Sequence, residues 1–120
     1  MKKEEARPVF DRDFALEITD GDIEFLKELV EVFSSQYPEK LASISLGIKG
    51  KDFKTISETA HSLKGSSGNL GLTRVYELSS EIERLAEKGQ TEDIEKLYIE
   101  IEEELGRFKE FVSMPGWEEE

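Results

Sequence analysis

The sequence has no cysteine and a single histidine, and these two shortages exclude several kinds of functional site. Without cysteine the chain can form neither a disulfide framework nor a thiolate-ligated metal centre, which fits a reducing compartment. One histidine cannot supply a His-Glu-x-x-His zinc site. The serines near it lack both a nucleophile-elbow pattern and an evident orienting acid, so they do not indicate a hydrolytic triad. We therefore predict that the chain holds no metal and is not an enzyme.

Long hydrophobic runs and an excess of positive charge are also missing. No apolar run approaches the length of a membrane span, and the start of the sequence lacks the apolar core of a signal peptide. The 28 acidic and 16 basic residues give a formal net charge of -12. Nucleic acids and anionic membranes repel such a surface. We predict a cytoplasmic protein that binds neither of them and whose partners carry basic or apolar docking features.

The apolar residues that are present recur at spacings of three and four, the pattern of amphipathic helices. We find no credible strand and no internal repeat, and 120 residues are enough to bury one core. The predicted fold is all-α: an antiparallel up-down four-helix bundle with a short additional N-terminal helix. A single domain is expected over residues 1–120, with residues 1–8 flexible and residues 115–120 as a tail.

Capping residues, glycines and prolines set the expected helix boundaries. A short helix starts near Asp11, and a long one follows the cap at Asp22, contains Pro38 as a candidate kink and ends at Gly47 and Gly50. The third helix begins after the cap at Asp52 and closes around residues 68–71, the fourth runs from about residue 72 to residue 89, and Thr91 caps the last. The expected inward-facing residues are Phe14, Ala15 and Ile18 in the first helix; Ile23, Leu26, Val30, Phe33, Tyr37, Leu41, Ile44 and Ile48 in the second; Leu72, Val75, Leu78, Ile82 and Leu85 in the fourth; and Ile94, Leu97, Ile101, Leu105, Phe108 and Val112 in the fifth.

Phe25, Leu29 and Val32 lie off the main stripe of the second helix. We expect the short first helix to cover them. A patch that faces a partner is the alternative.

The single histidine, His61, belongs to the third helix. The apolar stripe of that helix consists of Phe53, Ile56, Ala60, Leu63, Ser67 and Leu70. At about 100° per residue, His61 lies roughly 130° from the centre of this stripe and faces solvent. Its neighbours on that face, at helical spacings of three, four and seven residues, are Ser57, Glu58, Lys64, Gly65 and Gly68.

Gly65 and Gly68 are the unusual members of this outer face. A glycine inside a helix costs about 1 kcal/mol relative to alanine, and a solvated face has no folding reason to accept that cost. Missing side chains let another molecule reach the His61 ring. Lys64, one turn further along, places a cation where a negative group attached to the ring would lie. This arrangement suits a histidine that accepts a phosphoryl group.

The segment AHSLKGSSGNLGL, residues 60–72, resembles the histidine phosphotransfer (HPt) domain family. In the motif of that family, His-x-x-Lys-Gly-Ser/Ala is followed by a small residue, an apolar residue and glycine. The resemblance implies that His61 takes a phosphoryl group from the aspartate of a response-regulator receiver domain and passes it to another receiver. Lys64 would stabilise the phosphoryl group, and Ser57, Glu58, Gly65 and Gly68 would form the docking surface around the ring.

The resemblance also implies that the receiver supplies Mg²⁺, so that this chain binds no cofactor itself. By analogy with the family the reacting nitrogen is Nε2, with the inner nitrogen hydrogen-bonded; Glu58 is the candidate partner, against a role as a solvated helix charge. Ser66 is a candidate hydrogen-bond donor to the phosphoryl group. Ser67 is expected to pack in the core, and Asn69 to belong to a turn.

Two other functions stay open. The chain could be the phosphoacceptor domain of a chemotaxis-type or hybrid histidine kinase, with a sensor kinase as partner. Nothing here binds ATP, because Gly65, Gly68 and Gly71 follow a helix and not a strand, so ATP would bind elsewhere. The chain could also be a non-catalytic helical interaction or dimerisation module in which His61 is incidental. We expect a monomer.

Overall fold

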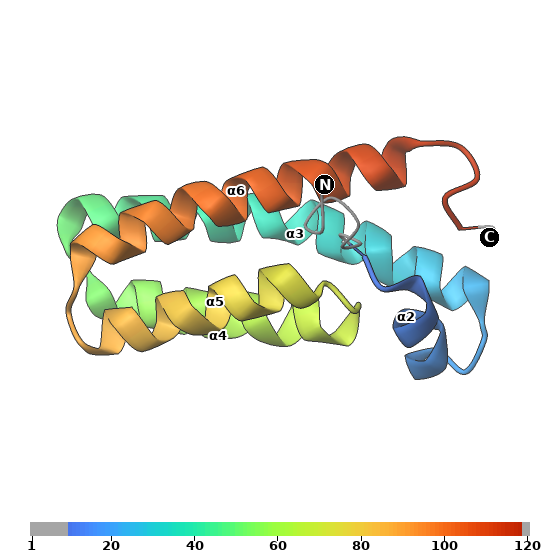
Figure 1. Ribbon diagram of the computed structural model, residues 1–120, viewed down its shortest axis with the longest axis horizontal. Coiled ribbons are helices and arrows are strands. Elements are labelled where there is room, and N and C mark those ends of the chain that lie inside the picture. The colour runs from blue at the N-terminus through green and yellow to red at the C-terminus, as the bar shows by residue number, and fades with distance from the viewer. Residues whose placement is uncertain (1–9, 119–120) are drawn as a thin grey trace, which may run out of the picture.

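The computed structural model of the chain describes residues 10–118. Over that range it forms five helices and no strand: α2 (Arg12–Ile18), α3 (Ile23–Gly50), α4 (Phe53–Asn69), α5 (Thr73–Glu87) and α6 (Thr91–Ser113) (Figure 1). The predicted all-α class is confirmed. The segment predicted to be flexible, residues 1–8, lies outside the described residues.

The four long helices form an antiparallel up-down bundle. α3 packs on α4, α4 on α5, α5 on α6, and α6 on α3, so each helix contacts the helices next to it around the ring. α3 and α6 extend beyond the turn between α4 and α5, and α2 lies in the space left at that end, against α3 (Figure 1). The antiparallel up-down four-helix bundle with a short additional helix is the architecture that the sequence predicts.

Aspartate caps begin the first three described helices. The carboxylates of Asp11, Asp22 and Asp52 each accept a hydrogen bond from the backbone N–H three residues on, at 3.1 to 3.2 Å. The expected cap at Thr91 is wrong, because Gln90 holds the cap position and Thr91 is already helical. The cap at Gln90 makes no side-chain hydrogen bond.

Gly47 does not end α3, contrary to expectation, and Pro38 does not interrupt it. The helix is continuous through both residues and ends after Gly50, where Lys51 takes a left-handed conformation with φ 54°. Gly47 is buried because α4 approaches it closely: a Cβ at this position would lie 2.7 Å from Cγ1 of Ile56. The glycine therefore permits the contact between α3 and α4 and does not end the helix.

The core consists of the predicted stripes of α3 to α6. Every expected inward residue of α5 is buried, and the half-exposed ones in the other two helices are Ile23 and Ile48 of α3 and Leu97 and Val112 of α6. The prediction is wrong for α2. Phe14 and Ile18 are 42% and 45% exposed, whereas Ala15 and Thr19 are buried on the face one residue further round. The small Ala15 side chain lets this two-turn helix lie close to the bundle.

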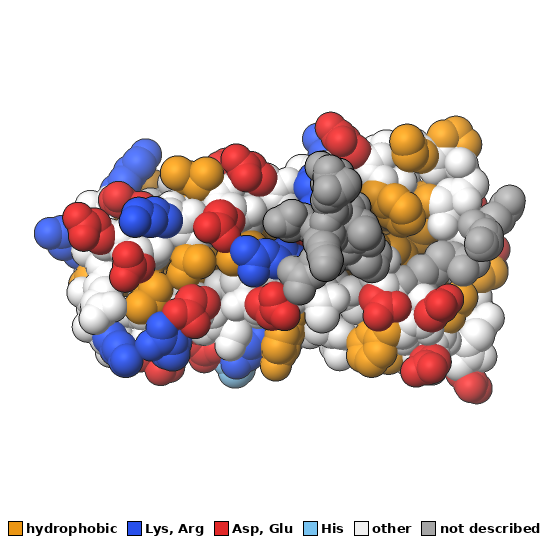
Figure 2. All heavy atoms as spheres, in the orientation of Figure 1, with side chains coloured by type: hydrophobic (Ala, Val, Ile, Leu, Met, Phe, Trp, Pro, Cys, Tyr) orange, Lys and Arg blue, Asp and Glu red, His pale blue; other side chains and the backbone are white. Residues whose placement is uncertain are grey.

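The expected cover over the outer residues of α3 is also missing. Phe25 and Val32 are 46% and 50% exposed, and only Leu29 packs against the core. α2 is too short to reach along this face, since seven residues span only about 10 Å. Figure 2 shows hydrophobic side chains at the surface of the end that holds α2, whereas acidic and basic side chains mingle over the rest of this face.

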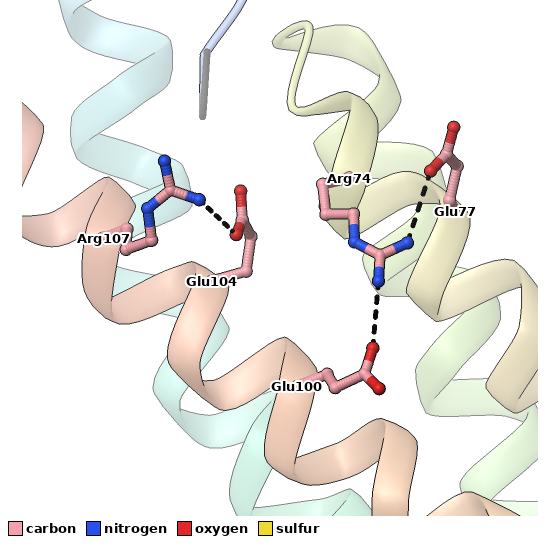
Figure 3. A network of polar contacts seen from close by, with 5 residues as sticks. All are labelled: Arg74, Glu77, Glu100, Glu104 and Arg107. Atoms are coloured by element: carbon pink, nitrogen blue, oxygen red, sulfur yellow. Dashed lines mark hydrogen bonds and ion pairs between the residues drawn. The ribbon is translucent and has the colours of Figure 1, made fainter. Parts of the chain in front are cut away.

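Ion pairs connect the exposed sides of α5 and α6. The Arg74 guanidinium lies between Glu77 of its own helix and Glu100 of α6, with N–O distances of 3.6 and 3.0 Å (Figure 3). One turn along α6, Arg107 pairs with Glu104 at 2.9 Å. Exposed pairs such as that of Arg74 with Glu100 contribute little stability. This pair joins the beginning of α5 to α6.

Candidate functional site

His61 lies on the outer face of α4, as the helical pattern predicts. Its side chain is 67% exposed, whereas Ala60 and Leu63 beside it in the sequence are fully buried. The helix holds the ring at a fixed place through its backbone, and the core stripe fixes the rotation of the helix. The ring is therefore presented to solvent from a rigid element.

Glu83 of α5 binds both His61 and Lys64. Its Oε2 atom lies 3.0 Å from Nδ1 of His61, and its Oε1 atom lies 3.0 Å from Nζ of Lys64. An ionised carboxylate can only accept hydrogen bonds, so Nδ1 carries the proton in this contact. The other ring nitrogen, Nε2, is then the one with a free lone pair.

The electrostatics of this cluster keep both partners of the ion pair charged. Burial acts to raise the pKa of Glu83, but the hydrogen bonds from Lys64 and His61 outweigh it and hold that pKa below its ordinary value. The hydrogen bond to Glu83 raises the pKa of Lys64 against the opposing effect of burial, and the carboxylate charges of Glu83 and Glu87 add to that rise. Near neutral pH the site therefore contains a carboxylate and an ammonium group beside the exposed His61 ring.

Of the two roles open to Glu58, the structure shows the solvated helix charge and not the bond to the inner ring nitrogen. Glu58 lies one turn before His61 and pairs instead with Lys54, at 3.5 Å, with both side chains largely exposed. The spacing of four residues places Lys54 and Glu58 on the same side of the helix and favours their ion pair. The carboxylate that holds the ring comes from the next helix.

The two glycines of the outer face differ in their surroundings. Around Gly65 no atom lies within 4 Å of the place where a Cβ would stand, so the surface next to the ring is open there. At Gly68 a Cβ would lie 3.1 Å from Cδ1 of Tyr76, so the ring of that residue covers the glycine. Ser57, the remaining member of the predicted docking surface, is half-buried.

The serines after Lys64 bond mainly to their own helix. Ser66 donates to the carbonyl oxygens of Ser62 and Leu63, at 3.2 and 3.3 Å, and the Lys40 ammonium lies 3.5 Å from its hydroxyl. Ser67 is fully buried, as expected. A donor role for Ser66 towards a phosphoryl group stays a prediction.

Sequence reasoning missed Glu83 and Tyr76. The signal that could have found Glu83 is the turn around residues 70–72, because in an antiparallel helix pair residues about equally far from the turn lie opposite each other. Glu83 follows the buried Ile82, so its position flanks the contact with α4. Among the described residues, no three histidine or carboxylate side chains converge to hold a metal ion.

Comparisons with known proteins identify the family of this chain. The model of the Hpt domain family matches residues 28–111. The chain is 30% identical over 96 residues to the phosphorelay intermediate protein rdeA of Dictyostelium discoideum, and 37% identical over 76 residues to the phosphorelay intermediate protein YPD1 of Candida albicans. These matches cover 80% and 63% of this chain but only 38% and 40% of the relatives.

Two solved structures share the fold. Histidine-containing phosphotransfer protein B of Pseudomonas aeruginosa superposes with a TM-score of 0.77 at 24% identity, covering 84% of this chain and 88% of that one. The HPT domain of a sensor hybrid histidine kinase from Shewanella gives a TM-score of 0.70 at 25% identity, covering 88% and 91%. The family match spans most of the chain and includes His61 and Glu83. The chain belongs to the histidine phosphotransfer (Hpt) domain family.

Proposed function

We propose that this chain is a phosphoryl carrier of a two-component phosphorelay, which accepts a phosphoryl group on His61 from a receiver-domain aspartate and hands it to a second receiver. One observation carries the proposal: the ring is exposed while Glu83 holds its inner nitrogen, so Nε2 is turned towards a visiting molecule. The names of the relatives, two of them phosphorelay intermediates, support it.

The transfer step balances with the groups in the site. The Nε2 lone pair attacks the phosphorus of the aspartyl phosphate, so an N–P bond forms while the bond from phosphorus to the aspartyl oxygen breaks. The aspartate leaves as a carboxylate with that electron pair, and the imidazole becomes positively charged. Glu83, which accepts the hydrogen bond from Nδ1, offsets this charge. The same contact keeps the ring in one tautomer.

Lys64 neutralises the arriving phosphoryl group in this proposal. Its ammonium is tethered to the carboxylate that also holds the ring, so it lies beside the ring without occupying Nε2. Phosphoryl transfer depends on in-line positioning and on neutralising charge more than on covalent assistance. The receiver is proposed to bring the acidic pocket and its Mg²⁺, so the chemistry is shared and this chain is a carrier, not an enzyme.

The partners follow from the same chemistry. Receiver domains are the donor and the acceptor of the phosphoryl group, and a sensor histidine kinase phosphorylates the donor receiver. No helix in the described part of the chain is long and apolar enough to cross a membrane. The monomeric state, the cytoplasmic location and the absence of nucleic-acid binding stay predictions from composition.

A transfer assay tests the proposal. The protein is incubated with receiver domains phosphorylated by a small-molecule phosphodonor, and acid-labile, base-stable phosphate is measured on it. Wild type should become labelled and His61→Gln should not, while Ser62→Ala, an exposed neighbour on α4, should behave as wild type. Equal labelling of wild type and His61→Gln, or no labelling by any receiver of a broad panel, overturns it. Labelling only from ATP through a sensor kinase would favour the kinase-domain alternative.

A further inference from the structure

Among residues 10–118, the hydroxyl of Ser79 is the one buried side-chain polar group without a hydrogen-bond partner. Ser79 belongs to α5 and is fully buried. A buried serine in a helix ordinarily donates to a carbonyl three or four residues before it, as Ser67 does to the carbonyl of Lys64 at 3.1 Å. A buried hydroxyl without a partner is destabilising, and alanine would fill nearly the same space. Packing therefore gives no reason for a hydroxyl at this position.

Ser79 lies midway between two contacts that join α5 to α4. The two helices are antiparallel and make the most extensive helix contact of the described chain. At one end Glu83 binds the ring of His61, and at the other end the ring of Tyr76 covers Gly68. Ser79 comes three residues after Tyr76 and four before Glu83, so all three share the face of α5 that packs on α4. It therefore faces the stretch of α4 between the histidine and that glycine.

The ion pair of Glu83 with Lys64 lies over the same point. Lys64 follows His61 by three residues, so it comes from the stretch of α4 that Ser79 faces. Helical side chains lean towards the N-terminus of their helix, so the Glu83 carboxylate extends back towards Ser79, one turn earlier. Its Oε1 atom is the one that meets Nζ of Lys64, at 3.0 Å. The register therefore places Oε1 on the side of the buried hydroxyl.

Phosphorylation of His61 changes what Glu83 binds. A phosphoryl group carries about two negative charges near neutral pH and the carboxylate carries one, so the phosphoryl group attracts the Lys64 ammonium more strongly. Burial acts to raise the pKa of Glu83, and the hydrogen bond from Lys64 is the largest of the effects that lower it. When Lys64 moves to the phosphoryl group, Oε1 loses the donor that keeps this carboxylate charged beside the ring.

We infer that Ser79 is a reserve donor to Glu83: its hydroxyl takes the place of Lys64 at Oε1 when the lysine moves to the phosphoryl group. The inference rests on the proposed function, because the phosphoryl group is what draws Lys64 away. Rotation about the Cα–Cβ bond turns the serine hydroxyl without moving the backbone. Ser79 touches neither the phosphoryl group nor the ring, so it is a positioning residue. It keeps the carboxylate charged, and the ring in place, after the transfer.

Stability measurements on the unphosphorylated chain test the inference without a receiver. In wild type, where Lys64 binds Glu83, Ser79→Ala removes an unpartnered hydroxyl and should raise the urea midpoint of unfolding. In a Lys64→Ala background the hydroxyl bonds Glu83, so the same substitution should lower the midpoint. Ser67→Ala is the control, because this serine is equally buried in the contact but is bonded to its own helix. It should shift the midpoint alike in both backgrounds.

Phosphoryl exchange with a receiver measures the same donor after transfer. Ser79→Ala loses a hydrogen bond to a charged group only in the phosphorylated form, so the equilibrium constant for phosphorylation by the receiver should fall about tenfold. In ¹⁵N-histidine NMR spectra, the Nδ1 signal of phosphorylated His61 should shift in Ser79→Ala, whereas the signal of the unphosphorylated ring should stay in place. Ser67→Ala should leave the equilibrium constant and both signals as in wild type.

The outcomes separate this inference from the proposed function. If Ser79→Ala shifts the midpoint equally in the wild-type and Lys64→Ala backgrounds, the serine only fills the contact between the helices, and the inference is wrong although the carrier function stands. A wild-type exchange constant in Ser79→Ala overturns it in the same way. If no receiver labels wild type, the proposed function fails and the exchange of donors on phosphorylation fails with it, whatever the stability measurements show.

Discussion

At the scale of single residues, the site depends on one carboxylate, that of Glu83, which binds both the His61 ring and the Lys64 ammonium group. Glu83 holds the His61 ring with one oxygen and the Lys64 ammonium with the other, at 3.0 Å each. This sharing couples ring orientation to the place of the cation. Neither the tautomer nor the Lys64 position can be fixed by residues of α4 alone.

Replacing Glu83 by glutamine tests this coupling. Glutamine keeps the shape and one acceptor oxygen but removes the charge, so transfer to His61 should slow by about tenfold or more while helicity by circular dichroism is retained. The raised pKa of Lys64 should fall towards its ordinary value, which NMR titration of the lysine can follow. Arg84→Gln, which removes a charge from an exposed pair on the same helix, is the control. An unchanged rate and an unchanged Lys64 titration would contradict the role given to Glu83.

The contacts of Glu83 with Lys64 and His61 should also make the stability of the fold depend on pH. Because the pKa of Glu83 is lower in the folded chain than its ordinary value of 4.5, its contribution is present above that value and is lost as the pH falls through the folded-state pKa. The difference in unfolding free energy between wild type and Glu83→Gln should therefore shrink below about pH 4.5. Urea unfolding at several pH values measures it. A difference that grows in acid would show that the carboxylate is not stabilised by Lys64 and His61.

Lys64→Ala removes the ammonium group of the site and so measures its contribution to transfer. The side chain is one-quarter exposed and pairs with Glu83, so its removal should leave the bundle folded. Transfer should slow, because the negative charge of the phosphoryl group is no longer offset. Stopped-flow or rapid-quench transfer rates measure the effect, and Lys54→Ala, an exposed lysine one turn before Glu58, is the matched control. Unchanged rates would remove Lys64 from the mechanism.

At the scale of elements, three glycines near the site have three different functions. Gly65 leaves the surface open, Gly68 receives the Tyr76 ring, and Gly71 turns the chain with φ 72° while its carbonyl accepts a hydrogen bond from the N–H of Asp11 at 2.9 Å. The sequence alone predicts the first of these functions, an open surface at Gly65. It cannot assign the others, because the rings and the Asp11 backbone come from segments remote in sequence.

The same alanine substitution should therefore have opposite effects at two of these glycines. Gly65→Ala meets no atom within 4 Å and gains helix propensity, so it should stabilise the fold by up to about 1 kcal/mol. Gly71→Ala forces a left-handed conformation on alanine and brings its Cβ to 2.7 Å from the Asp11 carbonyl oxygen, so it should destabilise by about 2 kcal/mol or more. Urea unfolding measures both. Equal effects at the two positions would contradict the described turn.

The long helices were predictable because each carries its own periodic stripe, which needs no knowledge of the other helices. The errors concern contacts between elements. Phe14 and Ile18 were expected inside, but the face that α2 turns inward is decided by the small Ala15, and a two-turn pattern fits either face. Spacing along α4 offers Glu58 as a carboxylate partner of His61, whereas the partner in the structure, Glu83, lies on α5.

At the scale of the whole molecule, aromatic residues tie both ends of the described chain to one end of the bundle. Phe10 contacts Phe108 and Phe111 of α6 and, at a centroid distance of 5.6 Å, Trp117. Trp117 follows α6 after a turn and folds back over this cluster, and Glu118 reaches Lys27 of α3 at 3.8 Å. The segment predicted as an acidic tail therefore packs on the fold through residue 118. Because Phe10 directly precedes the cap of α2, the same cluster holds α2 in place.

Trp117→Ala should therefore lower the unfolding free energy by about 2 kcal/mol, less than for a fully buried tryptophan because the side chain is half-exposed. Hydrogen exchange should show lost protection in α2 before the long helices are affected. Met114→Ala, in the same turn but 61% exposed, is the control. Wild-type stability together with unchanged exchange in α2 would show that the aromatic cluster does not hold that helix.

The central claim is that the His61 ring keeps its inner nitrogen on Glu83 and offers Nε2 to the incoming phosphorus. Because the chain has one histidine, labelling with ¹⁵N-histidine yields a single ring to observe by NMR. We expect a protonated Nδ1 before transfer, and phosphorus coupled to Nε2 after incubation with a phosphorylated receiver. Phosphorus on Nδ1, or a ring that stays unmodified while another residue takes the phosphate, would contradict it.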